Sequence, residues 1–138
     1  MLDESNKTHK LLGFLDAKEL IGFSYVIIAD NCLYIMYLAI NKLFRNKGYG
    51  SEVINILDKF YKPQTIYLSV EKPNGKDENR RIKFYQKNGF VLSGIQFDWL
   101  GTILIPMCKH KYDEKHLIKF LQKFFPEGKD YEDINIKT

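Results

Sequence analysis

Cysteine is scarce in this chain, and that scarcity excludes a disulfide-rich fold. Cys32 and Cys108 lie far apart among 138 residues, without the close spacing of a metal-binding knuckle or a disulfide framework. We expect both to be reduced, buried or half-buried thiols of a cytoplasmic protein. The three histidines, His9, His110 and His116, are equally isolated and lack metal-ligand spacing. We therefore predict no metal site.

Long apolar runs and blocks of one charge are also missing. No run approaches the roughly 20 apolar residues of a membrane span, and the polar start MLDESNKTHK is unlike a signal peptide. The net charge of +4 comes from 21 basic and 17 acidic residues, which are interleaved along the chain. Without a basic block, an aromatic-basic RNA signature or zinc-finger spacing, nucleic-acid binding is disfavoured. A small phosphate-bearing ligand suits this charge balance, and we expect no membrane partner.

The most informative stretch is LYIMYLAINKLFRNKGYGSEVINIL, residues 33–57. Residues 33–40 form an apolar run of strand length, and residues 45–50 form a basic turn with two glycines. Apolar residues at helical spacing follow, namely Val53, Ile54, Leu57 and Phe60. The order is strand, glycine turn, helix.

This order predicts an anion-binding site. The first N–H groups of a helix have no partner within the helix, and the aligned peptide dipoles add positive potential there. Gly48 and Gly50 allow a tight turn and a close approach of the backbone to a ligand. We predict that a pyrophosphate binds this turn.

The remaining patterns predict one domain over residues 1–138, large enough to bury a core. Residues 1–9 are an expected flexible N-terminus, and residues 127–138 an expected tail. Strands are predicted at residues 10–16, 20–29, 32–40, 65–71, 90–97 and 102–109. Helices are predicted from the glycine turn to about Tyr61, at 78–88 with Ile82, Phe84 and Tyr85 inward, and at 113–125. Asp113 is the expected cap of the last helix, which carries its apolar residues on one face.

Two blocks of this sequence form a recognisable pair of motifs. The first block is Leu38-Ala39-Ile40 followed by Arg45-Asn46-Lys47-Gly48-Tyr49-Gly50, and the second is Phe84-Tyr85-Gln86-Lys87-Asn88-Gly89-Phe90. They resemble the strand and (Arg/Gln)-x-x-Gly-x-(Gly/Ala) turn, and the Phe-Tyr-x-Lys-x-Gly-Phe segment, of the GNAT superfamily of acetyl-CoA-dependent N-acetyltransferases. Together they extend the resemblance over roughly residues 10–109.

The resemblance implies an α/β fold of the α+β, GNAT-like kind. Its central sheet is mixed and mostly antiparallel, with one splayed parallel strand pair and flanking helices. Compared with the family pattern, this chain is shortened at its N-terminus and carries an extra C-terminal helix. The family's acceptor wall must therefore come from elsewhere, either from the helix at 113–125 or from a second subunit. A homodimer stays open.

The same resemblance implies acetyl-CoA as cosubstrate. A bulge near Leu38 to Ile40 is expected to free backbone N–H groups for the pantetheine arm and the thioester oxygen. The pyrophosphate is assigned to the turn, formed by Arg45, Asn46, Lys47, Gly48, Tyr49, Gly50 and Ser51. Asn79 is a further candidate for a pantetheine contact, one place later than the family's asparagine.

For catalysis, the resemblance makes Tyr85 the general acid that returns a proton to the departing thiolate. The base is open. The strand before the turn has tyrosines, Tyr34 and Tyr37, where some relatives have a carboxylate. Glu71, at the end of its strand, is the candidate, and a water relay is the alternative.

The predicted function is transfer of an acetyl group to a primary amine by direct attack, without a covalent enzyme intermediate. The acceptor stays open among polyamine, aminoglycoside, amino acid, peptide N-terminus and protein lysine. The alternative function is a non-catalytic coenzyme A-binding sensor or assembly subunit. The aromatic residues Tyr34, Tyr37, Phe97 and Trp99 are predicted either as core or as lining of the acceptor pocket.

Overall fold

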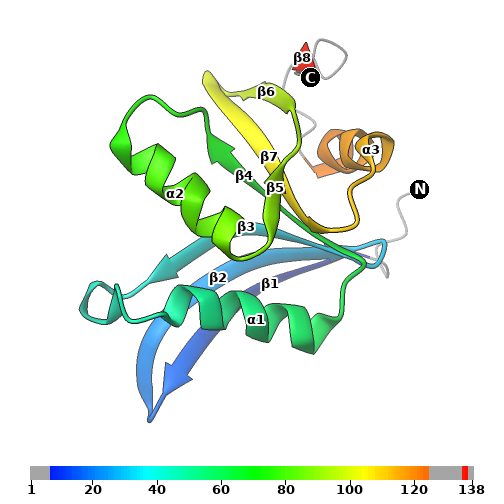
Figure 1. Ribbon diagram of the computed structural model, residues 1–138. Coiled ribbons are helices and arrows are strands. Elements are labelled where there is room, and N and C mark those ends of the chain that lie inside the picture. Colours follow the sequence, from blue (N-terminus) through cyan, green and yellow to red (C-terminus); the bar gives the residue numbers. More distant parts are fainter. Residues whose placement is uncertain (1–6, 125–134, 137–138) are drawn as a thin grey trace. The chain divides into compact units, whose positions relative to one another are not determined.

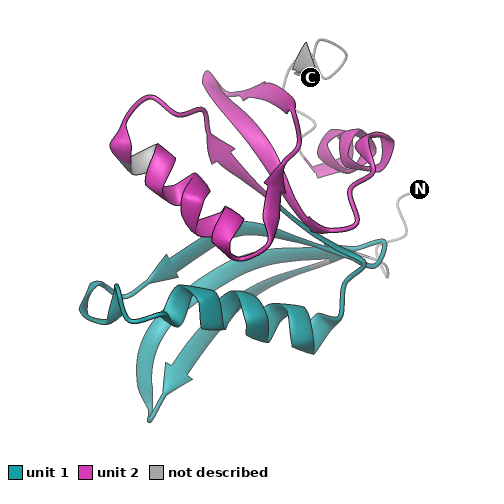
Figure 2. Ribbon diagram, viewed as in Figure 1, with its two compact units in different colours: residues 1–67 teal, residues 68–138 magenta. Residues whose placement is uncertain are grey.

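The computed structural model describes residues 7–124 and 135–136. The chain forms two compact units, residues 1–67 and 68–138 (Figure 2). The boundary falls inside strand β4 (Thr65–Glu71), so each unit contains part of this strand. None of the described helices is long and apolar enough to cross a membrane.

Unit 1 begins with a three-stranded antiparallel meander of β1 (Lys7–Asp16), β2 (Glu19–Ala29) and β3 (Cys32–Ile40), shown in Figure 1. Two-residue turns with positive φ connect the strands, at Ala17-Lys18 and at Asp30-Asn31, as tight hairpins require. The meander agrees with the predicted one. However, β1 begins at Lys7 rather than residue 10, because Lys7 to His9 pair with the far end of β2. The flexible N-terminus predicted for residues 1–9 is therefore too long.

Helix α1 (Tyr49–Tyr61) lies against β3. It buries Val53, Ile54 and Leu57, as the helical spacing predicts. Phe60 differs from this prediction because its side chain is 76% exposed. It lies in the last turn of the helix, where its ring packs edge-on against Tyr61 at 4.9 Å between centroids.

The strand β3 contains a bulge, two residues before the predicted position. Tyr25 pairs with Tyr37, whereas the next residue, Val26, pairs with Ile35. Met36 is therefore the extra residue, and both Met36 and Tyr37 are exposed. Leu38 and Ile40 are paired with β2, so the predicted bulge at 38–40 is wrong in its position.

Unit 2 contains the end of β4, then α2 (Lys76–Lys87), β5 (Phe90–Leu92), β6 (Ile95–Trp99), β7 (Thr102–His110), α3 (Glu114–Phe124) and β8 (Asn135–Ile136). Both β5 and β6 pair antiparallel with β7. The single strand predicted at 90–97 is therefore two strands. The break is at Ser93-Gly94, where Gly94 has a φ of 79° and the Ser93 hydroxyl accepts from the Ile95 N–H at 3.1 Å.

The two helices of unit 2 follow their predicted signals. Helix α2 begins two residues earlier than predicted, buries Ile82 and leaves Phe84 and Tyr85 half-buried. Gly89 follows its C-terminus with a φ of 92°, the left-handed conformation that favours glycine. Asp113 caps α3, because its Oδ1 accepts from the N–H groups of Lys115 and His116 at 3.0 and 3.3 Å.

The strand order is β1-β2-β3-β4-β7-β6-β8, with β5 paired to β7. The sheet is mixed and mostly antiparallel, with one parallel pair, so the predicted fold class is confirmed. Within the predicted tail, Asn135–Ile136 pair with β6 as a strand. The rest of that tail, and residue 125 of the predicted last helix, lie outside the described residues.

Candidate functional site

In unit 1, the turn between β3 and α1 has the backbone of an anion-binding loop. Asn46 and Gly48 have positive φ values of 63° and 85°. Gly48 is the N-cap of α1 and no side chain caps the helix. The N–H of Glu52 donates to the Gly48 carbonyl at 3.2 Å, so helix geometry leaves the N–H groups of Tyr49, Gly50 and Ser51 without intrahelical partners. Of the two glycines predicted to form the turn, only Gly48 has a left-handed backbone; Gly50 lies inside α1, so its predicted place in the turn is wrong.

The space in front of this turn is open. A Cβ added at the exposed Gly48 meets no heavy atom within 4 Å. The basic residues Arg45 and Lys47 are exposed on the same turn. Backbone donors, a helix N-terminus and two positive charges thus lie in one short segment, which suits an anion such as pyrophosphate.

Side chains at both ends of the turn hold it in place by hydrogen bonds. The Nε of Arg45 donates to the Ile40 carbonyl at 3.0 Å, while its terminal nitrogens carry further donors. The Tyr49 hydroxyl donates to Oδ2 of Asp16 at 2.8 Å. Between them, the Phe44 ring packs edge-on against Tyr49 at 5.8 Å and lies 6.0 Å from the Lys47 Nζ. The hydrogen bond to Asp16 raises the pKa of Tyr49, with smaller contributions from desolvation and nearby acids.

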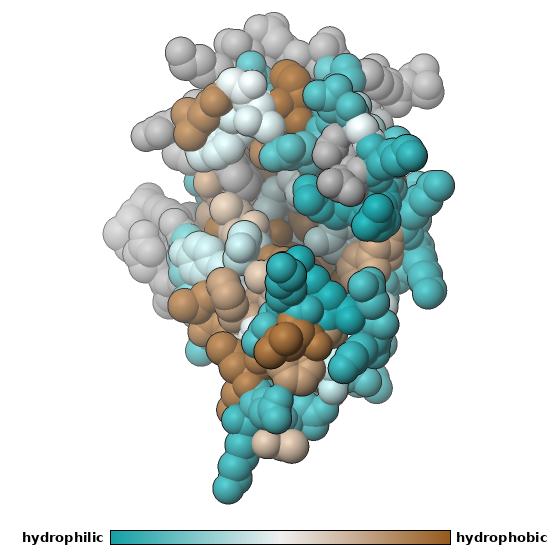
Figure 3. Space-filling view, turned by 90° about the vertical axis from the view of Figure 1, so that its left-hand side faces the viewer, coloured by the Kyte–Doolittle hydropathy of each residue, from teal (hydrophilic) through white to brown (hydrophobic). Residues whose placement is uncertain are grey.

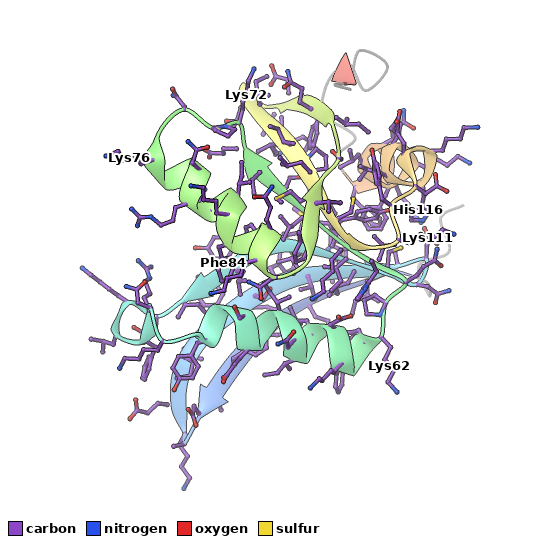
Figure 4. The ribbon with its side chains drawn as sticks, viewed as in Figure 1. Lys62, Lys72, Lys76, Phe84, Lys111 and His116 are labelled. Atoms are coloured by element: carbon purple, nitrogen blue, oxygen red, sulfur yellow. The ribbon has the colours of Figure 1, made fainter. Side chains whose placement is uncertain are left out.

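The second candidate group lies on α2 in unit 2. Tyr85 is in the last turn of this helix, next to Phe84, which Figure 4 labels near the end of α2 opposite Lys76. The Tyr85 ring packs against Phe84 and Phe90 at centroid distances of 5.2 and 5.7 Å. Among the described residues, none hydrogen-bonds its hydroxyl. Burial raises the pKa of Tyr85, partly offset by the positive charge of Arg81. Its phenol is thus a neutral proton donor at physiological pH.

The other predicted site residues of unit 2 are solvent-exposed. Glu71 is the exposed last residue of β4, and the following Lys72 N–H donates to the Ile103 carbonyl at 2.9 Å. Asn79 is exposed in the first half of α2. The general-base role of Glu71 and the pantetheine contact of Asn79 stay predictions.

The structure separates the four aromatic residues that the sequence left undecided. Tyr34 and Phe97 are buried in the cores of their units, Tyr37 is exposed, and Trp99 is half-buried. Tyr37 and Trp99 therefore keep the option of lining an acceptor site. The thiols of Cys32 and Cys108 are buried as predicted and form no disulfide, and burial raises the pKa of Cys32. No metal-binding group of three or more candidate ligands occurs in the described part of the chain.

The sequence did not predict the residues of β1 and β2 that contact β3 and the β3–α1 turn. Asp16 bonds Tyr49, as described above. Ser24 donates its hydroxyl proton to the Tyr37 carbonyl at 2.7 Å. Gly22 lies against Ala39, so closely that a side chain there would overlap the Ala39 carbonyl oxygen. Only Gly22 had a local signal, since a glycine inside a strand pattern often marks close backbone approach.

The family comparison agrees with this fold and turn. Residues 8–92, more than half of the chain, match the model of the acetyltransferase (GNAT) domain. The chain therefore belongs to the GNAT acetyltransferase family. No curated protein matches the sequence.

Solved structures give the same assignment. A Bacteroides thetaiotaomicron protein described as a GNAT-family acetyltransferase is 27% identical, with a TM-score of 0.70 over 87% of this chain and 73% of its own. A Bacillus anthracis protein described as a streptothricin acetyltransferase, solved with acetyl coenzyme A, is 25% identical, with a TM-score of 0.60 over 75% of this chain and 64% of its own. PaiA N-acetyltransferase from Thermoplasma acidophilum, solved with coenzyme A, shares the fold at 23% identity and a TM-score of 0.59, over 78% of this chain and 64% of its own.

Proposed function

We propose that this protein transfers an acetyl group from acetyl-CoA to a primary amine. The observation that carries the proposal is the β3–α1 turn, where an uncapped helix N-terminus follows a left-handed Gly48. Family membership and the coenzyme A-bound relatives support acetyl-CoA as the ligand. The turn suits its pyrophosphate, because backbone donors and two basic residues belong to one short segment and a Cβ added at Gly48 would meet no atom within 4 Å.

In this proposal, unit 1 holds acetyl-CoA. The backbone N–H groups of Tyr49, Gly50 and Ser51 bind the pyrophosphate, and Arg45 and Lys47 add positive charge. The N–H groups of Leu38 and Ile40 in β3 bind the pantetheine arm and the thioester oxygen. Asn79 of unit 2 is a further proposed contact to the pantetheine.

The reaction needs one bond formed, one broken and two proton movements. The neutral amine attacks the thioester carbonyl carbon, the C–N bond forms and the C–S bond breaks. The amine loses its proton to Glu71, directly or through water, and the departing thiolate takes a proton from the Tyr85 hydroxyl. Positioning of amine and thioester supplies much of the rate. Replacing Glu71 by Gln tests the base, with an expected loss of up to roughly 10²-fold in turnover.

Titration calorimetry with acetyl-CoA tests the proposal. We expect micromolar affinity for the wild type, and loss of binding in Gly48→Glu, because a carboxylate then occupies the anion site. Gly101→Glu is a matched control, since Gly101 has a similar φ of 92° and equally open space. Binding by the wild type followed by amine-dependent release of free CoA supports the enzyme. An absence of wild-type binding would contradict it.

The alternative is a domain that binds coenzyme A without catalysis. The half-buried Tyr85, whose hydroxyl has no hydrogen-bond partner among the described residues, favours the enzyme, because its phenol stays available to a substrate. Binding of acetyl-CoA without turnover on any amine of a broad library would favour the sensor.

We further propose a cytoplasmic protein that forms a homodimer. Two buried cysteines that form no disulfide suit a reducing compartment. For the dimer, the support is an apolar face of the meander, formed by Leu11, Leu15, Leu20, Phe23, Tyr25 and Tyr37. These residues are exposed, Leu11 to 71% and Leu15 to 68%, and cross-strand pairing places them on one side. In the space-filling view of Figure 3, brown hydrophobic residues lie in the lower part beside teal hydrophilic ones, and further brown residues lie higher in the view. The six side chains named here are uncharged, and His9 lies beside them with its Nδ1 2.8 Å from the Tyr25 hydroxyl. The six side chains can therefore meet their own copies about a twofold axis without like-charge repulsion among them.

A further inference from the structure

A buried serine of β2 forms a side-chain hydrogen bond to β3 just after the bulge. Ser24 is completely buried and pairs with Leu38 across the two strands. The Ser24 Oγ donates to the carbonyl oxygen of Tyr37, the residue before Leu38, at 2.7 Å. The bulge at Met36 lies directly before this carbonyl, at a place where the regular ladder is interrupted. The Ser24 hydroxyl thus provides Tyr37 with a hydrogen bond where the backbone ladder is disturbed.

This bond fixes the direction of the Leu38 N–H. The described chain contains no cis peptide bond, and in a trans peptide the C=O and the following N–H point in opposite directions. Because the Tyr37 carbonyl is held by a residue of β2, the Leu38 N–H points away from β2. It is therefore directed to the other side of β3.

A second contact between β2 and β3, two residues further along β3, orients another backbone N–H in the same way. Gly22 pairs with Ile40, and a Cβ at Gly22 would overlap the Ala39 carbonyl oxygen and come within 3.1 Å of Ile40 Cα. The Ala39 carbonyl therefore also points to β2, and the Ile40 N–H points away from it. Two donors on alternate residues then face the same side of β3.

We propose that Ser24 is a positioning residue for acetyl transfer, because its hydrogen bond aims the Leu38 N–H at the thioester carbonyl oxygen. This inference rests on the function proposed above. Negative charge grows on that oxygen as the amine attacks, so a fixed N–H donor stabilises the transition state more than the bound substrate. Gly22 permits the close approach that directs the Ile40 N–H in the same way. Ser24 itself touches neither substrate nor ligand.

The test compares Ser24→Ala with Ser93→Ala. Ser93 is also buried, and its hydroxyl also bonds backbone atoms, but within unit 2. Both variants lose a buried hydroxyl, so both are expected to lower the Tm. We expect kcat to fall by roughly 10- to 100-fold in Ser24→Ala alone, while the Kd for coenzyme A, which lacks the acetyl carbonyl, stays near the wild-type value. Ser24→Cys retains a weak donor and should recover part of the lost kcat.

Several outcomes would overturn the inference. A folded Ser24→Ala with wild-type kcat means that the hydroxyl only satisfies a buried carbonyl. Equal losses of kcat in Ser24→Ala and Ser93→Ala mean a general effect of lower stability. Should Ser24→Ala fail to fold, amide NMR of the wild type decides. The Leu38 amide proton is expected to shift on binding acetyl-CoA more than on binding CoA, and equal shifts would contradict its contact with the carbonyl oxygen.

Failure of the inference is distinguishable from failure of the proposed function. If the wild type binds and transfers acetyl groups while the Ser24 and Leu38 readouts stay unchanged, only the inference is wrong. If the wild type does not bind acetyl-CoA, the proposed function is wrong and the inference falls with it.

Discussion

Asp16 and Tyr49 are 33 residues apart, yet the Tyr49 hydroxyl donates to Oδ2 of Asp16 at 2.8 Å. Asp16 is the last residue of β1, and Tyr49 is the first residue of α1. The bond therefore ties the end of the β1–β2 hairpin to the proposed pyrophosphate turn. This hydrogen bond holds the C-terminal end of the β3–α1 turn, whose other residues are largely exposed.

We predict that Tyr49→Phe weakens coenzyme A affinity by about twofold to tenfold, the range expected for one lost hydrogen bond. The ring remains packed on Phe44, so the loss reports the bond to Asp16. Asp16→Asn keeps an acceptor oxygen and should preserve most of the affinity. Calorimetric titration of both variants checks this, and an unchanged Kd in Tyr49→Phe would show that the turn needs no anchor.

Because Asp16 raises the pKa of Tyr49, the phenol stays protonated up to at least its ordinary value near pH 10. A group whose pKa is raised on folding contributes stability below its unfolded pKa, and loses that contribution as the pH rises through its folded pKa. The Tyr49 anchor should therefore persist throughout the neutral range.

We predict that Gly22→Ala destabilises the protein by about 1–3 kcal/mol, because the new methyl group overlaps the Ala39 carbonyl oxygen and forces β2 and β3 apart. Gly13→Ala is the matched control in the neighbouring strand. Its added Cβ meets Leu20 Cδ1 at an ordinary 3.5 Å, so this variant should be neutral or slightly stabilising. Urea unfolding of both variants measures the difference, and equal stabilities would contradict the close approach at Gly22.

We predict that Tyr85→Phe lowers kcat by roughly 10²- to 10⁴-fold, the contribution of a general acid, with little change in acetyl-CoA affinity. Burial raises the pKa of Tyr85, so wild-type activity should not decline through loss of this proton until the pH passes about 10. Because the pKa of Tyr85 is raised on folding, the protonated phenol contributes to the free energy of unfolding below about pH 10, and this contribution is lost at higher pH. A pH–rate profile and stopped-flow kinetics provide the measurement.

Tyr112→Phe is the control for Tyr85→Phe. Burial also raises the pKa of Tyr112, but its hydroxyl donates to the Ser93 carbonyl at 2.7 Å. Removing it should lower the Tm without lowering kcat. If Tyr112→Phe and Tyr85→Phe reduce kcat equally, the general-acid role is wrong.

We predict that Leu11→Lys converts the proposed dimer to a monomer in analytical ultracentrifugation, because two lysines would meet in an uncharged contact. Ile56→Lys serves as control, since Ile56 is also an exposed apolar residue but lies on α1. A wild type that sediments as a monomer at all concentrations would exclude the dimer.

The amino-acid sequence by itself determined the features that depend on neighbours along the chain. The glycine turn before α1, the Asp113 cap of α3 and the Gly89 end of α2 all follow from local backbone preferences, and all three occur where predicted. The family assignment rested on the same short segments, and the domain match supports it.

Tertiary structure decided what depends on strand register. The bulge at Met36, rather than at 38–40, and the break at Ser93-Gly94 arise from how strands align with their partners, and sequence patterns determine alignment only to within a few residues. Ser24 with Tyr37 and Asp16 with Tyr49 are contacts between residues 13 and 33 positions apart. No local pattern marks such pairs, because they form only when the meander brings distant segments together.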